Sequence, residues 1–172
     1  MQEPAIDRAD RRLLLELSQR GRAASVELAQ SVHLSASAVA RRQRALEDAG
    51  VIRGYHADID PAAFGLTTTV VVQVTLKGQS EADLSEFEAA VQRCDSVLRC
   101  FLMSGSDDYV VIVLARDIED FERIHRTELS RLPRVARLES SFALREVVNR
   151  AVPPSVFGKT ARGSQRRRRA EA

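Results

Sequence analysis

The chain has 172 residues, 29% charged and 44% hydrophobic, a balance typical of globular proteins. Its longest apolar run, residues 109–115, is too short for a membrane-spanning helix, which needs roughly 18 residues. The N-terminus lacks the apolar segment of a secretory signal. Two cysteines and three scattered histidines form no disulfide framework and no zinc motif. We therefore expect a cytoplasmic protein that holds no metal and no other cofactor.

The charge is unevenly distributed along the chain. Residues 1–60 carry nine basic and nine acidic side chains, residues 61–150 carry eleven and fourteen, and residues 151–172 carry six and one. The net charge of +2 is therefore a property of the last segment. Because overall charge is a weak indicator of nucleic-acid binding here, any such function must follow from a local pattern.

The N-terminal third predicts three helices. The first extends from Asp7 to about Arg20. Asp7 is a suitable N-cap residue, and Asp10 has the spacing of a capping box. The second helix is short, with Ser25 as its expected N-cap. The third begins after Ser35 and ends at Ala49.

The second and third helices have the spacing of a helix-turn-helix motif. In this motif the third helix lies in the major groove of DNA. Arginine can pair with guanine or hold a phosphate, although a solvated helix face would also be rich in arginine. Two positions fit the motif less well, His33 at the turn and Gln43 in the apolar stripe. The candidate DNA-binding residues are Ser35, Ser37, Ala38, Arg41, Arg42 and Arg44.

The remainder of the chain predicts an α+β fold. Residues 51–59 alternate loosely, which favours a strand that ends before Pro61. From residue 67 the pattern is βαββαβ, which is typical of a ferredoxin-like domain. The expected strands cover residues 67–77, 97–103, 109–115 and 135–148, and the expected helices cover residues 81–93 and 117–132, with Ile118, Phe121, Ile124 and Leu129 on one face of the second.

The two most apolar strands are hydrophobic on both faces. Helices cover only one face of a ferredoxin-like sheet, so the other face needs a partner. A second copy of the same sheet is the simplest cover, and we therefore expect a homodimer.

The chain resembles the Lrp/AsnC, or feast/famine, family of transcriptional regulators. The resemblance rests on short stretches in the family's order, of which GVIRGYHADIDPAAFG at residues 50–65 is the most specific; the others are Ile6–Asp10, Val26–Ala29, Leu34–Ser35, Ala45–Glu47, Ser104–Gly105, Asp108–Tyr109 and Leu132–Pro133. It implies a winged-type helix-turn-helix domain over residues 1–50, a hinge strand and linker over 51–66, and an effector-binding and oligomerisation domain over 67–150. The partners implied are double-stranded DNA, an amino-acid effector and further copies that form a dimer or octamer.

The resemblance also implies an effector site. Gly105 would let backbone amides approach a carboxylate, and Asp108 would accept from an ammonium group. Asp107 stands where the family often has an aromatic residue or glycine, and Leu138 replaces a common threonine. An ordinary hairpin turn is the alternative interpretation. The candidate effector residues are Ser104, Gly105, Asp107, Asp108, Tyr109 and Ser140.

Two other features have simple interpretations. Cys100 lies in an apolar stretch and is expected to be a buried, inert thiol. Residues 151–172 lack apolar periodicity, and we expect a disordered basic tail. Its arginines would add non-specific phosphate affinity or merely aid solubility.

Two further functions remain open at the level of sequence. The two-domain outline also resembles sirohaem decarboxylases, tetrapyrrole enzymes for which Arg123, His125 and Arg126 would be the residues of interest. An effector-binding assembly protein with a vestigial DNA domain is the other alternative. The three arginines in the third helix favour the regulator.

Overall fold

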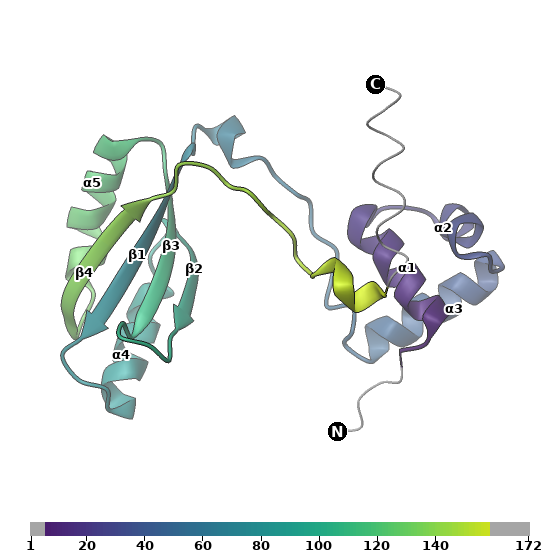
Figure 1. Ribbon diagram of the computed structural model, residues 1–172, viewed down its shortest axis with the longest axis horizontal. Coiled ribbons are helices and arrows are strands. Elements are labelled where there is room, and N and C mark those ends of the chain that lie inside the picture. Colours follow the sequence, from purple (N-terminus) through teal and green to yellow (C-terminus); the bar gives the residue numbers. More distant parts are fainter. Residues whose placement is uncertain (1–5, 159–172) are drawn as a thin grey trace. The chain divides into compact units, whose positions relative to one another are not determined.

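The computed structural model describes residues 6–158 of the chain (Figure 1). These residues form two compact units. One contains the described residues up to Asp58 together with those from Val148 onward, and the other is Ile59–Val147. Each unit has its own hydrophobic core.

The first unit contains α1 (Arg8–Gln19), α2 (Ser25–Val32) and α3 (Ala36–Asp48). The predicted capping box of α1 is confirmed, because the Asp7 carboxylate accepts from the backbone N–H of Asp10 at 2.8 Å. Ser35 caps α3 as predicted, accepting from the Ala38 N–H at 3.2 Å. The prediction for α2 is wrong by one residue, because Ala24 is the N-cap and Ser25 already belongs to the helix.

The turn between α2 and α3 has the left-handed backbone of a helix-turn-helix motif at His33, with φ 57° and ψ 47°. Leu34 closes the corner and packs partly buried against the core of the unit. That core is formed by side chains from all three helices: Leu13, Leu17, Leu28, Ala29, Val32, Val39 and Leu46.

The predicted strand over residues 51–59 is absent from the described chain. Val51 and Ile52 donate their backbone N–H groups to the Leu46 carbonyl and pack against the helical core. Residues 53–60 are exposed and in no sheet. Val51 and Ile52 therefore pack against the helical core, Ile59 is exposed, and within residues 6–158 no neighbouring strand provides the ladder that a strand requires.

The second unit is a four-stranded antiparallel sheet with two helices. Its strands follow the order β2 (Val97–Leu102), β3 (Tyr109–Ala115), β1 (Thr68–Leu76) and β4 (Val135–Phe142). The helices α4 (Glu81–Val91) and α5 (Ile118–Thr127) both lie on one face of this sheet (Figure 1). The predicted βαββαβ order is confirmed. Short 3₁₀ helices precede β1 at Pro61–Phe64 and follow α5 at Leu129–Arg131.

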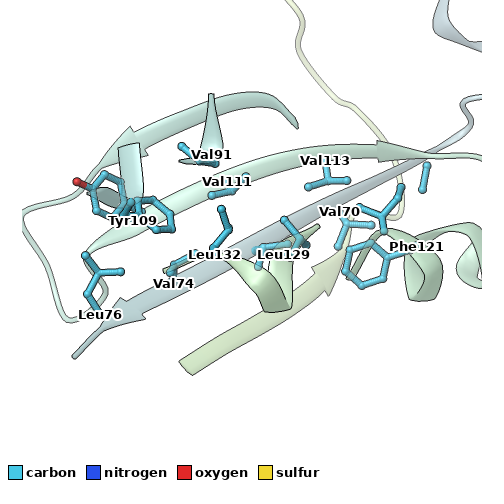
Figure 2. Close-up of a cluster of buried hydrophobic side chains, with 14 residues drawn as sticks. Val70, Val74, Leu76, Val91, Tyr109, Val111, Val113, Phe121, Leu129 and Leu132 are labelled. Atoms are coloured by element: carbon cyan, nitrogen blue, oxygen red, sulfur yellow. The ribbon is translucent and has the colours of Figure 1, made fainter. Parts of the chain in front are cut away.

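The two faces of the sheet differ in burial. Val70, Val72 and Val74 of β1 are completely buried under the helices. Figure 2 shows the resulting cluster, with Phe121 of α5 and Leu129 among the valines. The intervening Val71 and its cross-strand partner Ile112 are only half-buried, on the face opposite the helices. We call this second face the open face.

Several predicted element ends differ from the structure. The second helix of this unit ends at Thr127, and β4 ends at Phe142. Ile118, expected on the buried face of α5, is 71% exposed because it occupies the first residue of the helix. No helix in the described part of the chain is long and apolar enough to cross a membrane.

The predicted disorder of residues 151–172 is wrong where the structure describes them. Pro154–Phe157 forms a 3₁₀ helix, η3, in the same compact unit as α1. Residues 159–172 lie outside the described part of the chain.

Candidate functional site

The helix α3 presents a polar face to solvent because its apolar side chains are used in the core. Val39 and Leu46, seven residues apart, are buried against α1 and α2. Arg41 and Arg44 lie on the exposed side, and neither forms an ion pair within residues 6–158. This arrangement leaves two guanidinium groups free to bind an anion.

The beginning of α3 carries the remaining small candidates. Ser35 and Ser37 are exposed, with their hydroxyl oxygens 3.2 Å apart, and Ala38 is half-buried. The Ser35 hydroxyl is already used to cap the helix. Ser37 and the first backbone N–H groups of α3 therefore remain the polar groups that a phosphate or base edge can approach.

Arg42 does not match the prediction of a free DNA-binding side chain. Its Nη1 donates to Asp7 Oδ2 at 2.7 Å and to Asp10 Oδ1 at 2.8 Å. Hydrogen bonds to Asp10 and Asp7 raise the pKa of Arg42. The backbone N–H of Asp10 and then the Arg42 guanidinium lower the pKa of Asp7. Arg42 thus joins α3 to the first turn of α1.

The position of Gln43 is explained by a contact that the sequence did not reveal. Gln43 Nε2 donates to the Tyr55 hydroxyl at 2.8 Å, and that hydroxyl donates to Glu47 Oε1 at 2.7 Å. Burial, followed by the hydrogen bond to Glu47, raises the pKa of Tyr55. The polar Gln43 in an otherwise apolar stripe is the sequence feature from which this contact could have been found. The segment after α3 is therefore held on the second half of that helix.

In the second unit, the loop between β2 and β3 carries four of the predicted effector residues, and a fifth, Tyr109, is the first residue of β3. Ser104 and Gly105 are exposed at its tip. The loop is closed by backbone bonds on both sides: Met103 N–H donates to the Asp108 carbonyl at 2.8 Å, and Asp108 N–H donates to the Val74 carbonyl at 2.9 Å. A Cβ at Gly105 would meet open space, so the tip is accessible from outside.

Asp108 does not fit the predicted role of ammonium acceptor in this chain. The residue is 7% exposed, and its carboxylate accepts from the Leu76 backbone N–H at 2.7 Å. Its other oxygen accepts from Gln79 Nε2 at 2.7 Å. Because both oxygens are already paired, Asp108 joins the hairpin to the end of β1.

Asp107 lies on the open face instead. Its carboxylate accepts from Gln73 Nε2 at 3.0 Å and lies 3.5 Å from both Thr75 Oγ1 and Arg137 Nη2. These contacts are longer than those of Asp108, and three side chains from two strands provide them. Asp107 is therefore the acidic group of the loop with the looser set of partners.

Tyr109 and Ser140 lie on the opposite side of the sheet from Asp107. The Tyr109 hydroxyl donates to Glu88 Oε1 at 2.8 Å, and its ring lies 4.5 Å from that of Phe87 on α4. Figure 2 shows this residue at one end of the buried cluster. Burial is the main cause that raises the pKa of Tyr109. Ser140 pairs with Val72 and thus shares the helix-covered face, although it is exposed at the sheet edge.

The remaining candidate residues are two arginines of α5, which form ion pairs, and two cysteines, whose thiols are partly buried. Arg123 is paired with Asp120 at 2.8 Å, and Arg126 with Glu122 at 3.1 Å, both along α5. Burial raises the pKa of the Cys100 thiol to about 11, and burial also raises that of Cys94. Both arginines are thus already paired with a carboxylate on their own helix.

Comparison with known protein families assigns one family model to the helical unit and another to the unit that contains the sheet. The model described as winged helix-turn-helix DNA-binding matches residues 6–53. The model described as Lrp/AsnC ligand binding domain matches residues 69–153.

Whole-chain comparisons find regulators of transcription. The proline dehydrogenase transcriptional activator of Rhodobacter capsulatus is 38% identical over 148 residues, covering 86% of this chain and 96% of that protein. An uncharacterized HTH-type transcriptional regulator of Sinorhizobium fredii, y4sM, is 45% identical over 117 residues, covering 68% of this chain and 92% of that protein. Among solved structures, the transcriptional regulator NMB0573 of Neisseria meningitidis, in complex with L-Met, has a TM-score of 0.83 at 30% identity. That match covers 89% of this chain and 99% of the other.

Proposed function

Since the chain belongs to the Lrp/AsnC family and is a DNA-binding transcriptional regulator, we propose that it reads its operator with the exposed face of α3. Arg41 and Arg44 contact the DNA, while Arg42 fixes the helix on α1. Ser37, Ala38 and the amino end of α3 complete the contact surface.

The observation that carries this proposal is the difference in contacts among the three arginines of α3. Arg42 is bound at 2.7–2.8 Å to two carboxylates, whereas Arg41 and Arg44 are exposed on the same helix. The ion pair between Arg42 and the two carboxylates fixes the orientation of α3 on α1. A helix inserted into a groove gains from it, because its orientation decides which bases its side chains reach.

The ligand that we propose is an amino acid or a related small carboxylate. The solved relative NMB0573 was crystallised with L-Met, and the matching domain carries a ligand-binding description. In this chain the exposed Ser104 and Gly105 would approach the carboxylate of the ligand. Asp107 is the acceptor proposed for its ammonium group, because its contacts on the open face, at 3.0–3.5 Å, are longer than the 2.7 Å hydrogen bonds of the buried Asp108.

We also propose that two copies associate through the open face. Val71, Val110 and Ile112 form a half-buried apolar strip there. A twofold assembly would read an operator with two related half-sites. Assembly beyond the dimer, for example into octamers, is part of the same proposal.

The relatives are transcriptional regulators, and we propose that this chain likewise acts in the cytoplasm without catalysing a reaction. The tetrapyrrole decarboxylase alternative loses support from Arg123 and Arg126, which are paired along α5. Adding a tetrapyrrole to the purified protein should produce no bound Soret band.

The test of the proposed function is a gel shift on the DNA upstream of the protein's own gene, with each of the twenty amino acids added in turn. We expect a shifted band whose amount or mobility changes with at least one amino acid, and light scattering should show a dimer or larger species. The Asp107→Asn variant should respond less to that amino acid while it still binds DNA. Failure to bind any upstream fragment would support the vestigial-domain alternative.

A further inference from the structure

A cavity of about 400 Å³ lies between α4, the strand β2 and the first residue of β3. Its volume is in the range of pockets that hold small ligands. Because β2 is at the edge of the sheet, no further strand covers this side within residues 6–158. The cavity is separate from the proposed effector loop, since Ser104, Gly105 and Asp107 do not line it.

Most of the cavity wall is apolar. Side chains from α4, from the turn after it and from β2 provide this part of the wall: Val91, Cys94, Val97, Cys100 and Leu102. Both thiols are half-buried, and burial raises their pKa values, so they are uncharged near neutral pH. A thiol in this state behaves as a small hydrophobic group. The wall therefore favours a ligand with an aliphatic body.

Glu88 of α4 is the acidic residue of this wall. Its Oε1 accepts from the Tyr109 hydroxyl at 2.8 Å, and Tyr109 is itself only 1% exposed, so a buried ring holds the carboxylate in place. Figure 2 shows the Tyr109 hydroxyl directed away from the buried valines. Within residues 6–158, Glu88 forms no ion pair and its Oε2 accepts no hydrogen bond. One oxygen of a half-buried carboxylate is therefore available to a donor.

Arg99 is the other charged residue that lines the cavity. It pairs with Ile112, whose side chain lies on the open face, so the strand register directs the Arg99 side chain to that face as well. The charge of Glu88 acts on the opposite wall, because after burial it is the second cause that raises the pKa of Cys100. The cavity thus combines an apolar wall with a negative charge that no cation of the same face balances within residues 6–158.

We propose that this cavity binds a small aliphatic primary amine, with its ammonium group on Glu88 Oε2 and its apolar body against the wall. An ammonium group offers three donors, and a hydrogen bond between two charged groups is stronger than one between neutral groups. A ligand carboxylate in the same place would be repelled by Glu88. The site is distinct from the amino-acid site proposed at Asp107, and its existence does not depend on DNA binding.

The test titrates the full chain with isoamylamine in an isothermal calorimeter at fixed ionic strength. A ligand of this size is expected to bind with a Kd on the order of 1 mM.

Two further ligands keep the same branched apolar body and change only the polar group. Isoamyl alcohol lacks the charge, and isovalerate carries the opposite charge. Both should bind at least about tenfold more weakly than the amine. The proposal is overturned if isoamylamine does not bind at millimolar concentrations, or if either of the other two ligands binds as tightly.

The location of the site is tested with Glu88→Gln. The amide oxygen can still accept from the Tyr109 hydroxyl, but the charge is lost, so isoamylamine should bind at least about tenfold more weakly. Glu81→Gln removes the same charge from the exposed first turn of α4 and should bind the amine like the wild type. Wild-type affinity in Glu88→Gln would overturn the proposal.

Asp107→Asn distinguishes the cavity from the loop between β2 and β3. Loss of amine binding in this variant, together with normal binding by Glu88→Gln, would place the amine at the loop and overturn the proposal. Circular dichroism checks that each variant is folded. If Glu88→Gln does not fold, the comparison of the three ligands on the wild type still decides between the two results.

Discussion

The helix α3, which we propose contacts DNA, and the loop between β2 and β3 use their polar side chains in opposite ways. On α3, Arg41 and Arg44 remain exposed, and within residues 6–158 Arg42 is the arginine of this helix that binds carboxylates. In the loop, Asp108 is buried and fully paired, and Tyr109 is inside the core. The helix therefore offers free groups to a partner, whereas Asp108 of the loop and the adjoining Tyr109 hold the fold together.

The difference follows from the backbone. A helix satisfies its own interior backbone groups, so its outward side chains are free for other roles. At the hairpin, the Leu76 N–H at the end of β1 needs an acceptor, and Asp108 provides it. A single acidic loop residue thus stabilises the fold at a position where the sequence alone indicated a ligand contact.

The largest stability effect is expected for Asp108→Asn. The amide retains one acceptor oxygen, so one of the two donors, Leu76 N–H or Gln79 Nε2, faces an amide nitrogen. A buried, unsatisfied donor costs about 1–3 kcal/mol. Urea unfolding should show this loss, with the transition of the sheet unit moved to lower denaturant.

Asp107→Asn is the matched control, because its hydrogen bonds are longer and lie on the open face. It should lower the unfolding free energy by less than Asp108→Asn does. Equal losses for the two variants would remove the distinction between a structural Asp108 and a ligand-facing Asp107.

A smaller effect is expected for Arg42→Gln. Removing the guanidinium leaves Asp7 and Asp10 as neighbouring carboxylates, at a cost of about 1 kcal/mol for a partly exposed pair. The lowered pKa of Asp7 means that its contribution is present above its unfolded pKa of about 3.9 and is lost as pH falls through the lower folded value.

The unfolding free energy of the wild type should therefore decrease as pH falls below about 4, and Arg42→Gln should flatten part of that decrease. Thermal unfolding followed by circular dichroism across this pH range is the measurement. Arg44→Gln removes an exposed arginine from the same helix and should leave the pH profile unchanged. If both variants follow the wild-type profile, the ion pair does not stabilise the unit.

The smallest effect concerns the thiols. Because burial raises the pKa of Cys100 to about 11, little thiolate is present near neutral pH. Reaction of the folded protein with a thiol reagent at pH 8 should be slow and should accelerate in urea. Rapid reaction of Cys100 in the folded protein would contradict its assignment as an inert core thiol.

Much of the helical unit could be predicted because its signals are local. The capping box at Asp7 and Asp10, the Ser35 cap and the left-handed turn at His33 each depend on a few adjacent residues. The βαββαβ order could also be predicted from the sequence, because runs of β-branched residues alternate with segments whose apolar residues have helical spacing.

The remaining features depend on contacts between distant residues. Nothing near Arg42 in the sequence indicates that it reaches Asp7, 35 residues away, in preference to solvent. Val51 and Ile52 have the same apolar character whether they form a strand or pack against α3. The direction of a loop side chain such as Asp108 is likewise set by the strand end that it meets, so the loop between β2 and β3 was the least predictable part.

The most direct test of the central claim compares the arginines of α3 in binding to DNA from the upstream region. Arg41→Ala should weaken binding by about 1–3 kcal/mol and change the preferred sequence, whereas Arg44→Ala should weaken all sequences alike if it holds a phosphate. The double variant should remain folded by circular dichroism and lose specific binding. A double variant that binds the same DNA with wild-type affinity and preference would contradict the account.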